Sequence, residues 1–333
     1  MSINRETLVE WVRHFSAQQI VVVGDVILDE YLIGRATRIS REAPIPVLEF
    51  ESRREIPGGA ANPAVNIAAL GARAAQVGVI GADHEGGRLR AALEERGVQV
   101  GSLLVNPEQE TTVKTRVMAQ MGLRFPQQVA RLDRLPREPL SVETETLVAE
   151  MLAAELPTAS AVLFSDYQLG LNTPAVIRAS EGAALRVADT QGSFDKYAGF
   201  DALKCNADEA QAYLRRDLES EEDFAEAARE LFAMFGLKRC MVITRGALGA
   251  TLATADETHL CPAPAISEVY DTVGAGDTSV AVMALTLAAG ASPEAAVTLA
   301  NIASGLVVQR VGNYAPSASE LITAIRGEAG DKH

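Results

Sequence analysis

Short apolar runs recur along the chain, and each of them ends in a polar or acidic residue. The first is Ile20–Val23, which Gly24-Asp25 follows. Later runs at 160–166, 186–189, 202–206 and 240–246 end in Asp166, Asp189, Asn206 and Thr244-Arg245-Gly246. Uninterrupted apolar runs are typical of strands buried on both faces of a parallel sheet. Since parallel strands bring their carboxyl ends to one edge, we expect these polar residues to line a ligand-binding rim.

Segments of helical character alternate with these strands. Helices are predicted at 1–18, 64–70, 86–96, 278–289, 293–309 and 317–327. Residues 278–289 are rich in Ala and Leu and contain no Gly or Pro, which indicates a buried helix. The alternation predicts an α/β fold in which helices cover a mostly parallel sheet. Because no repeat, low-complexity tract or linker occurs, we expect residues 1–330 to form a single domain.

Two stretches, 31–56 and 110–133, break this alternation. Their alternating polar and apolar residues, with prolines at 44 and 46, indicate short, partly exposed strands. Lys114, Arg116 and Arg131 could form a basic cluster that holds a phosphate. A solvated strand face would explain each of these three residues taken separately.

The segment Tyr270-Asp-Thr-Val-Gly-Ala-Gly-Asp-Thr-Ser279 precedes the predicted buried helix. Its small residues Gly274, Ala275 and Gly276 leave backbone N–H groups uncovered at a helix N-terminus, which is a ready-made anion site. Asp277 either caps this helix or acts as a general base beside a phosphate that is being transferred. These ten residues do not decide between the two.

A second glycine-rich segment, Pro57-Gly-Gly-Ala-Ala-Asn62, precedes another predicted helix. Gly58 and Gly59 would expose backbone N–H groups, and Asn62 either binds a sugar hydroxyl or caps the helix. A turn and a ligand site explain the position of Asp25 equally well, whereas the position of Asp29 indicates a ligand site.

Composition narrows the possible partners and chemistry. The 333 residues carry a net charge of −14, which disfavours nucleic-acid and anionic-membrane partners. No window reaches about 18 uninterrupted apolar residues, and the N-terminus lacks a signal-peptide core, so we expect a cytoplasmic protein. Three scattered cysteines favour core positions over disulfides or metal ligation. No P-loop, G-x-S-x-G or H-E-x-x-H motif occurs, and no glycine fingerprint of a dehydrogenase follows the first strand.

Four motifs match a known family in order: Gly24 to Asp29, Gly58-Gly-Ala-Ala-Asn62, Asn206-Ala-Asp-Glu209 and Asp271-Thr-Val-Gly-Ala-Gly-Asp277. Over about residues 18–325 the chain resembles the ribokinase-like (PfkB-type) carbohydrate kinases. The resemblance implies a three-layer sandwich around a mostly parallel central sheet. It also implies that 31–56 and 110–133 form a small β-sheet lid.

Within this family the chain is most similar to the D-glycero-D-manno-heptose 7-phosphate kinases, through segments 24–50, 57–72, 112–117, 131–133 and 269–278. The likeness implies ATP-dependent phosphorylation of the anomeric C1 hydroxyl to the 1,7-bisphosphate, in ADP-heptose and lipopolysaccharide inner-core biosynthesis. Many members carry a nucleotidyltransferase domain with an H-x-G-H motif. That motif is absent here, so we expect a stand-alone kinase. Gln168 and Gln191 stand where the family leads us to expect Lys.

The resemblance also assigns roles to individual residues. Asp277 would be the catalytic base, with Gly274, Ala275 and Gly276 at the transferred phosphate. The sugar and its phosphate would contact Asp25, Asp29, Gly58, Gly59, Asn62, Lys114, Arg116, Arg131 and Asp166. ATP would contact Thr244, Arg245, Gly246, Gly249 and Asn301, while Asn206 and Glu209 would organise Mg²⁺ through water.

The implied partners are ATP, a sugar phosphate and a second copy of the chain, since a lid strand that pairs across subunits would cover an exposed edge. Another sugar kinase of this family, acting on ribose, fructose or another ketose, is the alternative enzyme. A sugar-phosphate sensor without catalytic activity is the alternative from a different class.

Overall fold

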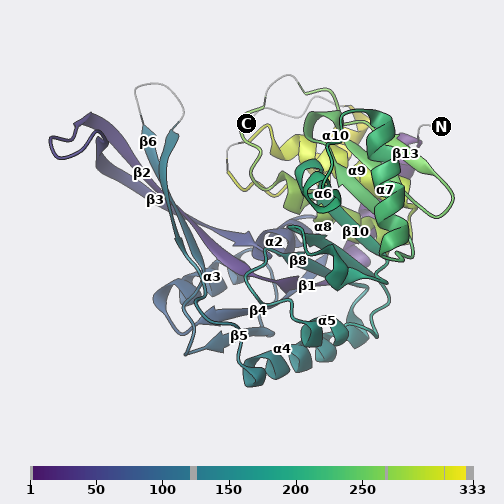
Figure 1. The fold of residues 1–333 in the computed structure, drawn as a ribbon, viewed down its shortest axis with the longest axis horizontal. Coiled ribbons are helices and arrows are strands. Elements are labelled where there is room, and N and C mark those ends of the chain that lie inside the picture. The colour runs from purple at the N-terminus through teal and green to yellow at the C-terminus, as the bar shows by residue number, and fades with distance from the viewer. Residues whose placement is uncertain (1–2, 121–125, 267–268, 311, 328–333) are drawn as a thin grey trace.

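The computed structural model describes residues 3–120, 126–266, 269–310 and 312–327. Its body is built on a nine-stranded sheet with the order β13-β12-β11-β10-β9-β8-β1-β4-β5 (Figure 1). The stretch from β5 to β11 is parallel, and β12 and β13 add antiparallel pairs at one edge. The strands are β1 (Gln19–Gly24), β4 (Arg73–Gly81), β5 (Leu103–Asn106), β8 (Ala161–Asp166), β9 (Arg186–Thr190), β10 (Ala202–Asn206), β11 (Cys240–Thr244), β12 (Ala250–Ala253) and β13 (Thr258–Cys261). The predicted, mostly parallel sheet is confirmed.

Alternate side chains of the central strands enter two cores, one on each face of the sheet. Ile20 and Val22 of β1 join the first core, whereas Val21 and Val23 join the second. The first core is covered by α1 (Arg5–Arg13), α2 (Ala61–Ala69), α3 (His84–Glu95), α8 (Ala275–Ala288), α9 (Pro293–Val307) and α10 (Ala318–Arg326). The second is covered by α4 (Val142–Glu155), α5 (Pro174–Arg178), α6 (Ala207–Leu214) and α7 (Glu221–Met234). Short 3-10 turns lie at His14–Ala17, Leu156–Thr158, Phe194–Tyr197 and Gly246–Leu248. Burial on both faces explains the uninterrupted apolar runs and confirms the three layers.

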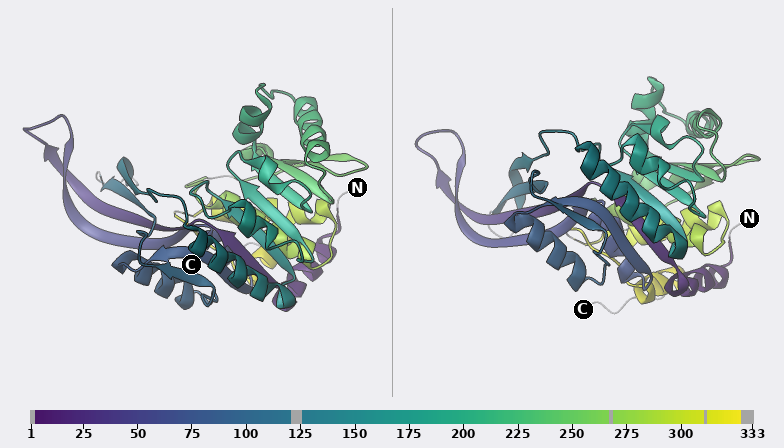
Figure 2. Two further views of the ribbon diagram at one scale, coloured as in Figure 1. Left: turned by 60° about the horizontal axis from the view of Figure 1, so that its bottom comes forward. Right: turned by 90° about the horizontal axis from the view of Figure 1, so that it is seen from below.

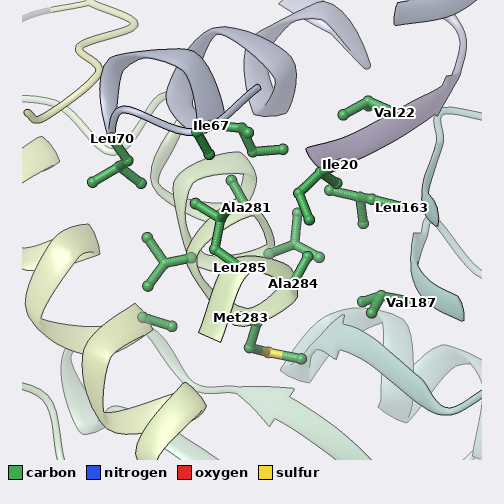
Figure 3. Close-up of a cluster of buried hydrophobic side chains, with 14 of the residues drawn as sticks. Ile20, Val22, Ile67, Leu70, Leu163, Val187, Ala281, Met283, Ala284 and Leu285 are labelled. Atoms are coloured by element: carbon green, nitrogen blue, oxygen red, sulfur yellow. The ribbon is translucent and has the colours of Figure 1, made fainter. Parts of the chain in front are cut away.

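Helix α8 lies at the centre of the first core (Figure 3). Ala281, Ala284 and Leu285 are fully buried, and Ile20 of β1 and Ile67 of α2 lie around them. A helix that is apolar on all sides has no face for solvent, so burial follows from its sequence. The predicted buried helix is therefore confirmed.

A separate four-stranded sheet, with the order β3-β2-β6-β7, projects from the body as a curved ribbon (Figures 1 and 2). Its strands are β2 (Val26–Ile39), β3 (Pro46–Gly59), β6 (Val113–Gln120) and β7 (Gln127–Arg134). The prediction of short strands is wrong for β2 and β3, which have 14 residues each. Both strands continue into apolar or glycine-rich sequence next to the body, at Val26–Leu28 and Pro57–Gly59, and that sequence does not alternate. The small sheet itself is as expected, and we call it the lid.

One face of the lid is anchored on the body. Glu30 of β2 forms an ion pair with Arg53 of β3 and accepts a hydrogen bond from the Thr115 hydroxyl over 2.6 Å. Glu55 of β3 forms ion pairs with Arg53 and with Arg88 of α3. This network ties the lid to α3, so the opposite face of the lid is the one available to a ligand.

Two expectations from composition can be checked against the structure. Cys205, Cys240 and Cys261 are buried and carry no disulfide, as small core residues do. Among the described residues, none of the helices combines the length and the apolar character that a membrane crossing requires.

Shortening Leu285 to Ala should lower the free energy of unfolding by about 2–5 kcal/mol, because it removes a fully buried side chain and leaves a cavity. Leu248→Ala is the matched control. Leu248 is 67% exposed, and its substitution should change the free energy of unfolding by less than about 0.5 kcal/mol. Urea unfolding measures both. Equal losses would contradict the central position of α8.

Candidate active site

A cavity of about 170 Å³ opens at the carboxyl ends of β8, β9 and β10, beside the first turn of α8. Its lining residues are Ser165, Asp166, Tyr167, Asp189, Gln191, Lys204, Asn206, Glu209, Gly274, Gly276 and Asp277. Three of the five strand ends predicted to form a ligand-binding rim meet in this cavity. The exceptions are the end of β1 at Gly24-Asp25 and the end of β11 at Thr244-Arg245-Gly246, which lie outside the lining.

Asp277 lies in the first turn of α8, and each of its carboxylate oxygens accepts a hydrogen bond. Asn62 Nδ2 donates to Oδ2 and the Tyr167 hydroxyl donates to Oδ1, each over 2.7 Å. No side chain in the described part of the chain caps α8. The interpretation of Asp277 as a helix cap is therefore wrong, because its carboxylate is held at the cavity by donors from two other elements.

Asn62 lies inside α2, which begins at Ala61, so its interpretation as a helix cap is also wrong. Asn66 Nδ2 donates to Asn62 Oδ1 over 3.2 Å, and Asn66 Oδ1 accepts from the Thr278 hydroxyl over 2.7 Å. Since Asn62 Oδ1 is occupied, its Nδ2 is the atom that faces Asp277. This chain of hydrogen bonds ties α2 to the start of α8.

Burial raises the pKa of Asp277 to about 6, and the negative charge of Asp189 adds to this rise. The hydrogen bonds from Asn62 and Tyr167 and the charge of Lys204 act in the opposite direction, because they stabilise the carboxylate. Burial and the neighbouring Asp277 raise the pKa of Tyr167 well above its usual value, so this hydroxyl stays a donor. A carboxylate whose pKa lies near ambient pH is suited to accept a proton.

Gly274 forms the N-terminal end of α8 with a φ of +82°. A Cβ at this position would lie 3.0 Å from Asn313 Oδ1 and 3.1 Å from Asn62 Nδ2, so glycine is required for conformation and for space. The N–H of Ala275 bonds to the Thr272 carbonyl over 3.3 Å, so this predicted phosphate donor already has an acceptor. For the N–H groups of Gly274 and Gly276, the described residues supply no acceptor.

Lys204 is the one cation among the cavity-lining residues of the described structure, and it is 4% exposed. Its Nζ lies 2.7 Å from Asp189 Oδ2, and a Cβ on Gly276 would lie 3.4 Å from it. Burial is the largest single influence and would lower the pKa of Lys204. The charge and hydrogen bond of Asp189, together with the charges of Glu209 and Asp277, outweigh it and raise the pKa, so the ammonium stays charged. A positive charge therefore lies beside residues 274–276, the predicted anion site, which we call the anion loop.

Asp25 and Asp166, both predicted to contact substrate, are engaged by donors within the protein. Asp25 accepts from the N–H groups of Tyr167, Leu169 and Leu171 over 3.0–3.1 Å. Asp166 Oδ2 accepts from Thr190, Lys196 and Tyr197 over 2.8–3.2 Å. Both carboxylates thus shape the loops around the cavity, and Asp25 in particular positions Tyr167.

Asp29 lies where the lid meets the body. Arg116 Nη1 donates to its Oδ1 over 2.5 Å, and Asn313 Nδ2 donates to its Oδ2 over 3.3 Å. A Cβ on Gly58 would lie 2.2 Å from Asp29 Oδ2, and Gly59 has a φ of +55°. The glycine pair therefore makes room for Asp29 and for the turn into α2, which differs from its predicted role of exposing N–H groups.

The structure brings the three predicted basic residues to one face of the lid. Lys114 Nζ lies 5.4 Å from the centroid of the Tyr167 ring, and Arg116 contacts Asp29. Arg131 stands directly opposite Arg116 across the β6–β7 pair. Sequence alone could not distinguish this cluster from three solvated residues.

On the other side of the cavity, Asn206 and Glu209 form the capping box of α6. Asn206 Oδ1 accepts from the Glu209 N–H over 2.9 Å, and Glu209 Oε2 accepts from the Asn206 N–H over 2.8 Å. Burial raises the pKa of Glu209, and Asp189 adds to the rise. Both residues line the cavity while they stabilise the helix.

The remaining residues predicted to bind the nucleotide lie outside the cavity lining. Thr244 donates from its hydroxyl to the Cys205 carbonyl over 3.2 Å. The Arg245 guanidinium lies 5.2 Å from the Phe224 ring, and Gly246 has a φ of +56°. Asn301 Nδ2 donates to the Cys261 carbonyl over 2.8 Å, and a Cβ on Gly249 would lie 2.1 Å from that carbonyl oxygen. Packing thus accounts for Gly249 and Asn301, and their nucleotide contacts stay predictions.

The structure also contains functional candidates that sequence reasoning missed. The first of these candidates is Tyr167, which lines the cavity. Of the two glutamines that stand where Lys was expected, Gln168 is exposed, and Gln191 lines the cavity without adding a charge. Lys204 could have been found, because a lysine interrupts an otherwise apolar strand. Asn313 carried no signal, since only the tertiary fold brings it to Asp29.

Comparison with known proteins places this geometry in a family. The model of the pfkB family carbohydrate kinases matches residues 17–320. The chain belongs to this family. Relatives named "Bifunctional protein HldE" from Caulobacter sp. (strain K31) and Chromohalobacter salexigens are 39% and 40% identical over 98% and 93% of this chain. The matches cover 66% and 64% of those proteins, so the chain spans slightly under two thirds of their length.

Solved structures share the pfkB fold. Escherichia coli phosphofructokinase-2 in complex with substrates and products has a TM-score of 0.77, and Arabidopsis thaliana ribokinase complexed with ribose and ATP has 0.73. Each is 20% identical, and each match covers 93% of this chain and 98% of the other. At this identity the likeness shows the fold. Membership of the pfkB family makes the chain a sugar kinase.

We expect the acid limb of kcat/KM for sugar phosphorylation to fall about tenfold per pH unit below about pH 6, where Asp277 becomes protonated. Tyr167→Phe should move this limb up by about one pH unit, because it removes a donor that stabilises the carboxylate. Tyr213→Phe, which removes a hydroxyl bonded to Asp195 at the surface, is the control and should leave the limb in place. An unmoved limb in Tyr167→Phe would contradict the assignment.

Proposed function

We propose that this sugar kinase transfers phosphate from ATP to the anomeric C1 hydroxyl of D-glycero-D-manno-heptose 7-phosphate. The product would be the 1,7-bisphosphate of ADP-heptose and lipopolysaccharide inner-core biosynthesis. The observation that carries the proposal is the position of the Asp277 carboxylate. Both of its oxygens accept hydrogen bonds, and it lines the cavity beside Gly274 and Gly276, whose N–H groups have no acceptor among the described residues. The basic face of the lid and the resemblance to heptose 7-phosphate kinases support the phosphorylated substrate.

In the proposed reaction, the Asp277 carboxylate removes the proton from the sugar hydroxyl. The hydroxyl oxygen attacks the γ-phosphorus of ATP in line, and the bond to the ADP oxygen breaks. Asn62 and Tyr167 hold the base in one orientation, which is the main demand that phosphoryl transfer makes on a protein. The N–H groups of Gly274 and Gly276 and the Lys204 ammonium would stabilise the negative charge of the transferred group.

The cavity suits a hard cation that arrives with the nucleotide. Four carboxylates line it, and carboxylate oxygens are ligands that Mg²⁺ prefers. In the described structure no group of three or more His, Cys, Asp or Glu could hold a metal ion by itself. Asn206 and Glu209 would therefore hold Mg²⁺ through water, together with the phosphates of ATP. When bound, Mg²⁺ supplies charge neutralisation at the phosphates.

The proposed assembly is a homodimer formed through the lid. Strands β3 and β7 are the edges of the lid sheet, and an exposed edge invites pairing with another chain. Phe50 of β3 and Leu132 of β7 are 70% and 71% exposed, which is unusual for such large apolar side chains. A second lid would cover both features.

Asp277→Asn should lower kcat by about 10²–10⁴-fold, because it removes the general base, while ATP binding stays within a few-fold of wild type. ADP release with a panel of sugars and sugar phosphates measures the first, and calorimetry with ATP measures the second. Asp256→Asn, at an exposed turn, is the control and should keep full activity.

The panel also separates the alternatives. Turnover confined to unphosphorylated sugars would favour another sugar kinase of the family. Binding of sugar phosphates with no turnover of any panel member would favour a sensor. Normal turnover by Asp277→Asn would contradict the role of this residue as the base.

Replacing Phe50 and Leu132 together by Glu should convert a dimer to monomers, because four carboxylates would enter the shared surface. Light scattering after size exclusion measures the mass. Val142→Glu changes an equally exposed apolar residue on α4 and should leave the mass unchanged. A wild-type monomer at micromolar concentration would contradict the proposed assembly.

A further inference from the structure

Cross-strand pairing places four side chains in one line across the lid. The pairs are Arg54 with Tyr31, Tyr31 with Arg116, and Arg116 with Arg131. Directly paired residues project from the same face of a sheet. We call these four residues the arginine row. Arg54 and Tyr31 are new members of the site, since neither was predicted to bind substrate.

The arginine row lies on the face of the lid that looks at the active site. One step toward the body, on the same face, lie Asp29 and Lys114. Asp29 contacts Asn313, and Lys114 lies over the Tyr167 ring, whose hydroxyl binds Asp277. The opposite face carries Glu30 and packs toward α3. The row therefore stands about 7 Å outward from Asp29 along the strands, on the side away from the base.

The three guanidinium groups of the row differ in their partners. Arg116 is bonded to Asp29 over 2.5 Å, and Arg131 Nε is bonded to Asp133 over 2.9 Å. Arg54 is exposed, and the described residues supply it with no ion-pair partner. Arg116 and Arg131 stand directly opposite one another, and like charges in such a cross-strand pair repel. An anion bound between them would remove this repulsion.

Tyr31 stands between Arg54 and Arg116 with an unused hydrogen-bonding group. Its ring lies 5.2 Å from the Arg116 guanidinium carbon, and its hydroxyl is buried without a partner among the described residues. Burial raises the pKa of Tyr31, so the hydroxyl stays protonated and can donate. Buried polar groups in native proteins almost always have a partner, which indicates that a bound group completes this one.

We propose that the arginine row is a subsite for the phosphomonoester of the sugar substrate. Arg54 and Arg131 bind phosphate oxygens from two sides, and the Tyr31 hydroxyl donates to a third. Arg116 holds Asp29 against the sugar. Guanidinium groups suit this task, because their planar donors match phosphate oxygens in pairs. The inference rests on the proposed function and deepens it, since it names the residues that select a sugar whose phosphate is remote from the reacting hydroxyl.

Arg54→Gln should weaken binding of heptose 7-phosphate by about tenfold or more, because a charge-assisted hydrogen bond to phosphate is lost. Affinity for the same heptose without its phosphate should not change. Tyr31→Phe keeps the ring under Arg116 and should weaken only the phosphorylated sugar, by about twofold to tenfold. Calorimetry with both sugars measures these affinities, and the KM for ATP checks that the nucleotide site is intact.

Arg35→Gln is the matched control. Arg35 lies four residues farther along β2 on the exposed part of the lid, where it forms an ion pair with Glu49 over 3.1 Å. This variant removes the same charge and should leave both affinities unchanged. Equal losses for the two sugars in Arg54→Gln, or losses of the same size in Arg35→Gln, would overturn the subsite.

Inorganic phosphate as a competitor separates this inference from the proposed function. If the wild type turns over only unphosphorylated sugars, the proposed substrate is wrong. The subsite would still stand if phosphate binds at least several-fold more weakly to Arg54→Gln than to wild type and Arg35→Gln. Phosphate that binds equally to all three proteins would overturn it.

Discussion

The hydrogen bond between Asn62 and Asp277 joins segments that lie 215 residues apart, and the candidate site depends on it. Asn62 belongs to α2 and Asp277 to α8, and both helices pack in the same core. Asn66 and Thr278 continue the contact inside that core. The orientation of the candidate base is thus a consequence of how two buried helices pack. A change in the packing of α2 against α8 would move the carboxylate relative to the anion loop.

As a sugar kinase, the protein must bind anionic ligands although its net charge is −14. Its cavity contains four carboxylates and one lysine, an arrangement that would repel a bare polyphosphate and would favour one that carries a divalent cation, as proposed above. Positive charge is concentrated on one face of the lid, on strands that leave the acidic body. The two ends of the proposed sugar-phosphate substrate would therefore meet different electrostatic surroundings, with helix N–H groups at one end and guanidinium groups at the other.

Sequence patterns predicted the body of the fold well, because strands buried on both faces and a helix without a polar face leave unambiguous apolar runs. They predicted the lid less well. The first residues of β2 and the last residues of β3 lie next to the body and are apolar or glycine-rich. The alternation typical of an exposed sheet therefore covers only part of each strand. The capping interpretations of Asn62 and Asp277 failed because local sequence cannot show that two polar side chains satisfy each other across the core.

The sequence by itself determined the parallel sheet, the buried α8, the glycine loop before it and the residues at the strand ends, since each follows from local periodicity or from backbone conformation. The resemblance of its motifs identified the family. Only the tertiary structure decided that Tyr167 and Asn62 hold Asp277 and that Lys204 stands beside the loop. It alone put Arg54, Tyr31, Arg116 and Arg131 in one line. These arrangements depend on strand register and helix packing between distant segments, and no local pattern encodes a distance across the fold.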